Sequence, residues 1–291
     1  MALKLKLGIP KGSLQNYTLK IFKEAGFNID IPERGYFLKI DDPEIDCFLL
    51  RPQEIPKYIE KRKLDLGISG DDWILESRAK VIEVCDLKYA KQEMKKVKWV
   101  LAVPENSKIK SIKDLEGKII STEIVNLVKD YLRKNKVKAK VEFSWGAAEI
   151  KPPRFADAIV DITETGASLK AHNLKILDTI LVSSTKLITN KEAWKNKWKI
   201  KKIKDLALLL QGAVRGEGAV SLIMHVPGEK LNRILKVLPK LKSPTVRKTA
   251  GQNWYDVIIS CKEEEARELI PKLKRMGGQG IVEFPIIKLV P

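Results

Sequence analysis

The stretch KLKLGIPKGSLQNYTLKIFKEA, residues 4–25, contains the signals of a strand, a turn and a helix in that order. Residues 1–7 alternate with period two, as Leu and Lys do at positions 3–7, which is typical of a strand, and we expect this strand at residues 4–10. The apolar residues of the segment that follows recur at helical spacing: Leu14, Tyr17, Ile21, Phe22 and Ala25. A strand that leads through a short turn into a helix is the building unit of α/β proteins.

The same alternation continues along the chain. Further strands are predicted at 44–51, 65–69, 99–104, 118–121 and 140–143, and residues 155–161 are predicted to be a strand or a passage from helix to strand. Helices are predicted at 54–61, 71–77, 111–115 and 124–134 and from residue 167 onward. The fold class is therefore α/β with parallel sheets. We expect one domain at residues 1–97, completed by residues 183–211, and a second at 98–182. Within the completing segment, residues 187–211 are predicted to be helical.

The last part of the chain has a different order of elements. Residues 212–218 contain three glycines and predict a linker. The segments that follow read as strand, helix, strand, helix and strand, at 219–226, 229–238, 256–261, 263–276 and 280–287. This order predicts a small ferredoxin-like α+β domain at residues 213–291.

Composition excludes several classes of protein. The chain has 291 residues, 44% of them hydrophobic, but no apolar run approaches the ~18 residues of a membrane span. The N-terminus lacks the pattern of a signal peptide, so we expect a cytoplasmic protein that does not bind membranes. Three widely spaced cysteines predict neither a disulfide framework nor a zinc site.

The net charge of +18 comes from 55 basic and 37 acidic residues. The excess is spread over the chain, with no basic tail and no recognisable nucleic-acid module. A solvated basic surface is therefore favoured over a nucleic-acid footprint. A small polyanionic substrate is compatible with the same charge.

Ligands of open parallel sheets bind beyond the carboxyl ends of the strands. Lys11, Gly12 and Ser13 follow the first strand, where Gly12 permits close approach to an anion and Ser13 can cap the helix. Arg51 ends the next strand and can bind a phosphate through two nitrogens. An ordinary strand–turn–helix junction would explain residues 11–13 equally well, and a surface ion pair would explain Arg51.

A third junction contains Gly70 and Asp71. Gly70 allows tight approach, and either Asp71 or the next residue, Asp72, is a suitable helix cap. Capping by at least one of these aspartates is the favoured interpretation.

The stretch ADAIVDITETGASL, residues 156–169, is the most informative for function. An apolar strand leads into acidic residues and then into a turn with two hydroxyls, Thr165 to Ser168, that can wrap a terminal phosphate. Asp161, a few residues upstream, can accept hydrogen bonds from a ribose diol. This pairing indicates a ribose 5-phosphate site, although a well-capped helix has a similar pattern. No Walker A motif and no Gly-x-Gly-x-x-Gly after a strand occurs.

Five motifs resemble, in order, those of the ATP phosphoribosyltransferase family: Pro10–Leu14, Arg51–Pro56, Asp65–Asp71, Gly146–Glu149 and Asp157–Leu169. The C-terminal part resembles the regulatory domain of the long form of the family, at Val226–Pro227, Leu238–Pro239, Ser243–Thr245, Trp254 and 273–281. The resemblance covers essentially the whole chain.

The resemblance implies two α/β domains around a cleft, as in periplasmic binding proteins, and a third domain that binds L-histidine as feedback inhibitor. It implies a phosphoribosyltransferase of histidine biosynthesis, which transfers the phosphoribosyl group of phosphoribosyl pyrophosphate to N1 of ATP and releases pyrophosphate. It implies Mg2+ as cofactor and dimers that assemble into a hexamer. It also implies activity without the separate regulatory subunit that the short form needs.

Residue by residue, the resemblance implies catalytic roles for Asp161, Lys11 and Arg51. It implies substrate binding by Gly12, Ser13, Gly70, Asp71, Glu149, Glu164, Thr165, Gly166, Ala167 and Ser168. It implies a regulatory site that includes His225, Thr245, Gly277 and Gly278. The Mg2+ ligands stay unassigned.

Three positions depart from the family pattern. The segment between Glu149 and Ala156 is one residue shorter and lacks a glycine. Ser168 stands where threonine is commoner, and His225 where Asn or Asp is usual. Two rival functions stay open, a protein that only captures a small anion in its cleft and a catalytically inactive regulatory homologue.

Overall fold

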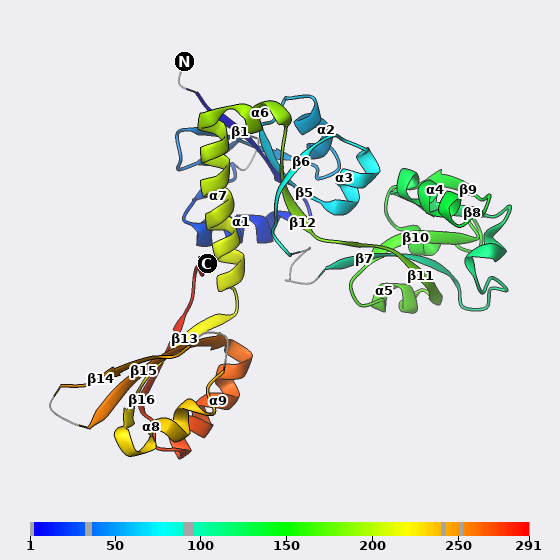
Figure 1. Cartoon of the computed structure of the whole chain (residues 1–291). Coiled ribbons are helices and arrows are strands. Elements are labelled where there is room, and N and C mark those ends of the chain that lie inside the picture. The colour runs from blue at the N-terminus through cyan, green and yellow to red at the C-terminus, as the bar shows by residue number, and fades with distance from the viewer. Residues whose placement is uncertain (1–2, 33–36, 90–95, 240–242, 251–252, 291) are drawn as a thin grey trace. The chain divides into compact units, whose positions relative to one another are not determined.

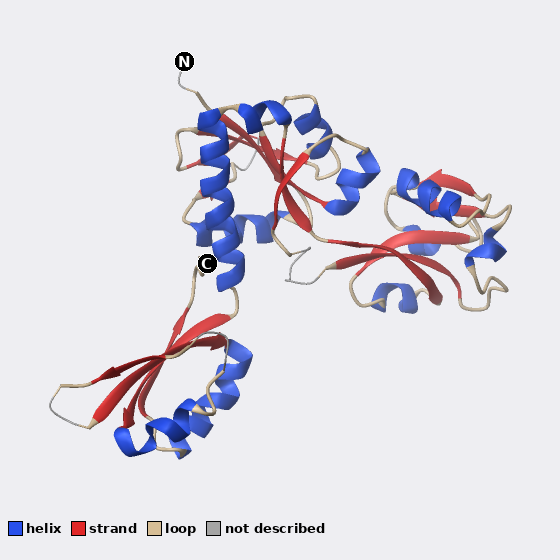
Figure 2. Ribbon diagram, in the orientation of Figure 1, coloured by secondary structure: helices blue, strands red, loops and turns tan. Residues whose placement is uncertain are grey.

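The computed structural model describes residues 3–32, 37–89, 96–239, 243–250 and 253–290 (Figure 1). The chain folds into two compact units, Met1–Ala207 and Leu208–Pro291. The first unit contains two sheets, which define two α/β lobes, and the second unit contains one sheet (Figure 2).

The first lobe is built on a seven-stranded sheet of order β2-β3-β4-β1-β5-β12-β6. Its strands are β1 (Leu5–Pro10), β2 (Ile29–Asp30), β3 (Phe37–Ile40), β4 (Ile45–Leu50), β5 (Leu66–Gly70), β6 (Ile82–Asp86) and β12 (Thr185–Thr189). Its helices are α1 (Gln15–Ala25), α2 (Ile55–Glu60), α3 (Asp71–Ser77), α6 (Lys191–Lys195) and the start of α7 (Lys197–Gly216).

The prediction of parallel sheets holds only for the middle of this sheet. Strand β1 runs parallel to β4 and β5, whereas β3 and β12 pair antiparallel with their neighbours. The connection between β3 and β4 spans only residues 41–44, and a parallel pair would need a crossover of a dozen or more residues.

The second lobe is a five-stranded sheet of order β11-β7-β10-β8-β9. Its strands are β7 (Val97–Pro104), β8 (Ile119–Thr122), β9 (Lys140–Phe143), β10 (Ala158–Thr163) and β11 (Leu174–Ser183). The helices are α4 (Val125–Lys134), α5 (Ala167–Ala171) and the 3-10 turns η1 (Ile112–Leu115) and η2 (Ala148–Ile150). Strands β8, β9 and β10 are parallel, so the loops that follow them share one edge of the sheet.

The chain passes between the two lobes twice. It crosses from β6 to β7 and returns from β11 directly into β12, which completes the first sheet between β5 and β6. This is the periplasmic-binding-protein-like arrangement expected from the sequence. Residues 187–189, predicted to be helical, belong instead to β12, because a buried strand is needed to close the sheet there.

The second unit contains β13 (Ala219–Pro227), α8 (Gly228–Leu235), β14 (Thr245–Lys248), β15 (Trp254–Lys262), α9 (Glu263–Arg275) and β16 (Gln279–Pro285). The antiparallel order β14-β15-β13-β16 is that of a ferredoxin-like fold, which confirms the predicted class of this part. Strand β14 was not predicted, because all of its residues are exposed and carry no alternating pattern.

The prediction of a linker at residues 212–218 is wrong. Helix α7 continues through Gly216. Its glycines allow the C-terminal segment to approach, since a Cβ at Gly216 would lie 2.6 Å from the carbonyl oxygen of Ile287. The backbone nitrogen of Leu289 also donates to the carbonyl of Gly212 at 2.8 Å. These glycines therefore serve close packing.

No helix among the described residues combines the length and the apolar character needed to cross a bilayer.

Candidate active site

Lys11 and Arg51 lie at neighbouring strand ends of the first lobe. Strands β1 and β4 pair in register up to Pro10 and Leu50, and the nitrogen of Lys11 donates to the carbonyl of Leu50 at 2.7 Å. Gly12 has a φ of +102°, and a Cβ there would lie 3.8 Å from Nη1 of Arg51. The structure thus brings these three predicted site residues together.

Ser13 does not cap the following helix, contrary to the capping suggested by the sequence. Helix α1 has Leu14 at its N-cap, without a side-chain cap. The nitrogen of Gln15 instead donates to the carbonyl of Gly12 at 3.0 Å, while Oε1 of Gln15 accepts from the nitrogen of Gly12 at 3.4 Å. This tight turn leaves the side chain of Ser13 exposed.

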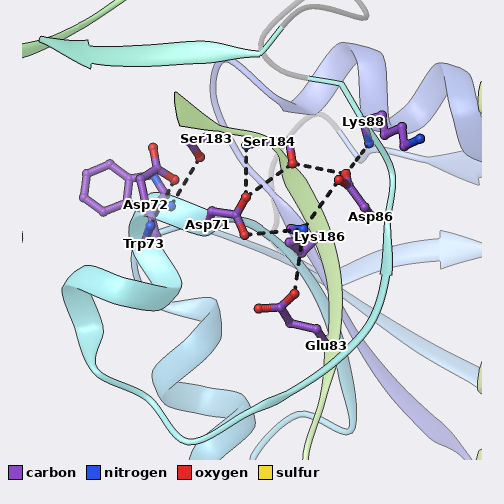
Figure 3. Close-up of polar contacts among 9 residues, drawn as sticks. All are labelled: Asp71, Asp72, Trp73, Glu83, Asp86, Lys88, Ser183, Ser184 and Lys186. Atoms are coloured by element: carbon purple, nitrogen blue, oxygen red, sulfur yellow. Dashed lines mark hydrogen bonds and ion pairs between the residues drawn. The ribbon is translucent and has the colours of Figure 1, made fainter. Parts of the chain in front are cut away.

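The sequence also suggested a helix-capping aspartate at the start of α3, and this is wrong. The N-cap is Gly70, and the carboxylate of Asp71 turns toward β12 (Figure 3). Its Oδ2 lies 3.3 Å from both the nitrogen and the hydroxyl of Ser184, and its Oδ1 lies 3.7 Å from Nζ of Lys186. Asp71 thus fixes the point where the chain re-enters the first lobe.

Lys186 is the centre of a half-buried charge cluster (Figure 3). Its Nζ lies 3.5 Å from Asp86 and 3.7 Å from each of Asp71 and Glu83. Burial alone would lower the pKa of Lys186, but the surrounding carboxylates raise it above its ordinary value. This lysine therefore stays charged, and its ammonium group holds three carboxylates of the first lobe together.

Asp72 is a buried acid that links the two lobes, and sequence reasoning did not single it out for that role. Only 3% of its surface is exposed, and its Oδ2 accepts a hydrogen bond from Nε1 of Trp99 at 2.8 Å. Its backbone nitrogen donates to the hydroxyl of Ser183 at 3.2 Å. Burial raises the pKa of Asp72, although the hydrogen bonds to its carboxylate oppose the rise.

The loop after β10 in the second lobe is tightly organised. The hydroxyl of Thr163 accepts from the nitrogen of Gly166 at 2.8 Å, and that of Thr165 accepts from the nitrogen of Ala167 at 3.3 Å. Gly166 has a φ of +82°, a left-handed conformation that favours glycine. The side chains of Glu164, Thr165 and Ser168 are exposed at this turn.

Glu149 belongs to the same group of residues. Its Oε1 accepts a hydrogen bond of 2.8 Å from the hydroxyl of Ser168, although the two residues are 19 positions apart in the chain. Asp161 lies half-buried in β10, and its Oδ1 accepts from the nitrogen of Ile162 at 2.7 Å. The bond to Ser168 therefore brings Glu149 to the turn at residues 164–168, and Asp161 lies in the strand that leads into this turn.

A cavity of about 670 Å³ is lined by residues from both lobes. Arg51 and Lys57 come from the first lobe, and Phe143 and Trp145 come from the segment that ends and follows β9. Of the side chains predicted to form the site, Arg51 alone is among the described residues that line this cavity. The aromatic lining was missed, because only the folded chain brings residues 143–145 to the position of Arg51.

Helices α3 and α4 connect the lobes beside this cavity. The two carboxylate oxygens of Glu76 accept from the nitrogens of Asn126 and Leu127, each at 3.0 Å. Asn126 returns a bond from its side-chain nitrogen to the carbonyl of Glu76 at 2.9 Å. A glutamate of the first lobe thus satisfies free N–H groups in the first turn of a helix of the second lobe.

The predicted regulatory residues are dispersed in the second unit. Nδ1 of His225 lies 2.6 Å from Oδ1 of Asp256, across the β13–β15 pair. Thr245 begins β14 at one edge of the sheet, while Gly277 and Gly278 precede β16 at the other edge. One copy of this unit does not bring Thr245 to the glycine turn.

No group of three or more His, Cys, Asp and Glu side chains within the described part of the chain is arranged to hold a metal ion.

The two α/β lobes carry loops at the carboxyl ends of parallel strands, and proteins of this class bind ligands beyond such strand ends. The sequence pattern of the family described as "ATP phosphoribosyltransferase" matches residues 51–212, and that of the "HisG, C-terminal domain" matches residues 217–288. The chain belongs to the ATP phosphoribosyltransferase family and, because it carries the C-terminal domain, to its long form.

Curated relatives match nearly the full length. The ATP phosphoribosyltransferase of Thermodesulfovibrio yellowstonii is 54% identical over 287 residues, which cover 99% of this chain and 98% of that protein. The ATP phosphoribosyltransferase of Chlorobium phaeobacteroides is 52% identical, over 98% of this chain and 97% of that protein. The prediction of a phosphoribosyltransferase of histidine biosynthesis is thereby confirmed.

Among solved structures, the chain is similar to one in the ATP phosphoribosyl transferase (HisG:HisZ) complex from Thermotoga maritima. The TM-score is 0.61 at 29% identity, and the match covers 71% of this chain and 98% of that chain.

Proposed function

We propose that this chain transfers the phosphoribosyl group of phosphoribosyl pyrophosphate to N1 of ATP and releases pyrophosphate, in the cytoplasm. The observation that supports this most is the end of β10, where Glu149 bonds to the turn at 164–168 and Asp161 lies in the strand that leads into it. An acid beside a hydroxyl-bearing turn suits a ribose that carries a 5-phosphate.

The turn at residues 164–168 binds the 5-phosphate in this proposal. Thr165 and Ser168 offer exposed hydroxyls, and the left-handed Gly166 lets the phosphate approach the backbone. Asp161 accepts hydrogen bonds from the ribose diol. Glu149 and Glu164 flank the ribose and keep its orientation.

The cations of the first lobe neutralise the polyphosphates. Lys11 and Arg51 lie at adjacent strand ends, and Gly12 and Ser13 allow an anion to approach the backbone between them. Gly70 and Asp71 are proposed to bound the nucleotide, with Asp71 held in place by Ser184 and Lys186.

The reaction needs no protein nucleophile. A bond forms between N1 of the adenine and the anomeric carbon, and the bond from that carbon to the pyrophosphate oxygen breaks, with the electron pair leaving on pyrophosphate. The chain contributes by positioning two polyanions and by stabilising the charge of the departing group.

Mg2+ is the proposed cofactor. It would neutralise the leaving pyrophosphate. The donor chemistry fits, because Mg2+ is usually held by substrate phosphates and only one or two carboxylates. Asp161 and Glu164 offer such oxygens at the end of β10.

The C-terminal unit is proposed to bind L-histidine and to inhibit the enzyme, with His225, Thr245, Gly277 and Gly278 in the site. Since Thr245 and the glycine turn lie on opposite edges of one sheet, a complete site would combine residues of two copies, which agrees with a proposed assembly of dimers into a hexamer. Coupling between two such sites is typically worth about 1–3 kcal/mol.

Two experiments test this function. Mixing the protein with ATP, phosphoribosyl pyrophosphate and Mg2+ should give a product of the mass of phosphoribosyl-ATP, and an unchanged ATP mass would contradict the reaction. Histidine titrated at several concentrations of both substrates should inhibit without strict competition. Strict competition with either substrate, or no binding of histidine, would contradict the regulatory part.

A further inference from the structure

Two exposed aromatic side chains line the cavity between the lobes. Trp145 has 83% of its surface exposed and Phe143 has 53%. Their ring centroids are 4.8 Å apart with planes at 89°, so the edge of one ring packs on the face of the other. Large apolar side chains left exposed in a concave, otherwise polar site indicate a ligand surface.

The segment that carries Trp145 is fixed on both sides. The nitrogen of Ser144 donates to the carbonyl of Thr122 at 3.0 Å, and that of Gly146 donates to Oε1 of Glu123 at 3.0 Å. Gly146 turns the chain with a φ of +40°. The backbone that carries the indole is therefore held at a defined position, and the ring of Phe143 packs against the indole, as a binding surface requires.

The same cavity is also lined by charged and polar side chains that can bind the polar parts of a nucleotide. Arg51 and Lys57 supply positive charge from the first lobe. Glu123 and Asn126 supply hydrogen-bond acceptors and a donor beside the aromatic pair. A flat apolar surface together with cations suits a planar base joined to a polyphosphate, and stacking on an aromatic ring tolerates every base.

We propose that Trp145, supported by Phe143, is the stacking surface for the adenine ring of ATP, and that Arg51 and Lys57 bind the triphosphate. This inference rests on the proposed function and names where one substrate of that reaction lies.

The position of Trp145 along the chain agrees with the reaction. Glu149 follows four residues later and bonds to Ser168 in the proposed phosphate turn. Four residues span at most about 14 Å when fully extended. A base on Trp145 and a ribose beside Glu149 would therefore both lie against one short segment of the second lobe, as a reaction between them requires.

The test compares ATP with inorganic tripolyphosphate, which has the charge but no base. Dissociation constants of both are measured by calorimetry on the full-length protein and on Trp145→Ala and Trp145→Phe. Phe155→Ala is the matched control, because Phe155 is 72% exposed on the same connection between β9 and β10 but does not line the cavity.

We expect Trp145→Ala to raise the Kd of ATP by about 5- to 150-fold, which corresponds to about 1–3 kcal/mol of stacking. The Kd of tripolyphosphate should stay unchanged, Trp145→Phe should restore most of the affinity for ATP, and Phe155→Ala should change neither constant.

Three results would overturn the inference. They are an unchanged Kd of ATP in Trp145→Ala, an equal loss for ATP and tripolyphosphate, and a smaller assembly with unchanged ATP affinity, which would make Trp145 a contact between copies. Binding is measured without turnover, so failure here is distinct from failure of the reaction, which the product mass reports.

Discussion

The indole nitrogen of Trp99 donates a 2.8 Å hydrogen bond to the carboxylate of Asp72, and this bond joins helix α3 of the first lobe to strand β7 of the second. Asp72 also accepts from the nitrogen of Trp73, whose ring meets that of Trp99 edge-on at 5.9 Å. Trp73 lines the cavity, so the buried carboxylate holds one cavity wall in place.

The contribution of Asp72 to the free energy of unfolding should decrease as pH rises. Its pKa is raised by burial, so the folded state binds the proton more tightly than the unfolded state does. The contribution is complete below the unfolded value of ~3.9 and is lost as pH rises through the folded value. Denaturant unfolding measured from about pH 4 upward should show this slope, and Asp72→Asn should remove it. A slope that is identical in both proteins would contradict the assignment.

Removing the hydrogen-bond acceptor at residue 72 should lower stability more than replacing its carboxylate by a neutral amide. Asp72→Ala leaves the buried N–H of Trp99 without its acceptor, which should cost about 1–3 kcal/mol relative to Asp72→Asn. Thermal unfolding of both variants at one pH tests this, and equal midpoints would show that the bond to Trp99 contributes little.

Glu76 should stabilise the contact between the lobes. Glu76→Ala removes the acceptor for the nitrogens of Asn126 and Leu127, and loss of such a cap costs about 0.5–2 kcal/mol. Glu105→Ala, at an exposed position after β7, is the control. The free energy of unfolding should fall only in the first variant; a similar fall in both would point to a general loss of charge.

Asp161→Asn should weaken the use of phosphoribosyl pyrophosphate while the fold stays intact. Loss of a hydrogen bond to a charged group costs about 1.5–3 kcal/mol, or about 10- to 150-fold in kcat/KM. Steady-state kinetics in both substrates, with circular dichroism to check folding, provide the measurement. Unchanged kinetics would remove Asp161 from the site.

The phosphate turn should tolerate change at Ser168 far better than at Gly166. Ser168→Ala removes one hydroxyl and its bond to Glu149, so a mild loss is expected. Gly166→Val forces a β-branched residue into a φ of +82° and should abolish most activity. Kinetic constants of the two variants decide this, and equal activities would speak against a turn built from the backbone.

The sequence was sufficient to predict those helices and strands whose apolar residues recur at one regular spacing. The central strands β1, β4 and β5 and the helices between them carry apolar residues at regular spacing, and their predicted bounds agree with the structure within a residue or two. Strand β11 was missed because two register shifts interrupt its pairing with β7 and break the alternation.

The candidate site was predictable only in part. The turn at residues 164–168 and Arg51 directly follow predicted strands. Because ligands of such sheets bind beyond the strand ends, their position in the sequence was enough to nominate them. Asp72 could not be told from its neighbour Asp71, since only the folded chain buries one and turns the other toward β12. Trp145 carries no local signal, because its role depends on a cavity formed by distant segments.

Attachment of the ribose to N1 of the adenine is the central claim, and labelled ATP tests it most directly. ATP enriched in 15N at N1 is incubated with the enzyme, phosphoribosyl pyrophosphate and Mg2+, and the product is examined by NMR for coupling between the label and the new anomeric proton. We predict a product in which the labelled nitrogen couples to that proton. A product whose ribose is joined to another atom, or ATP recovered unchanged, would contradict the account.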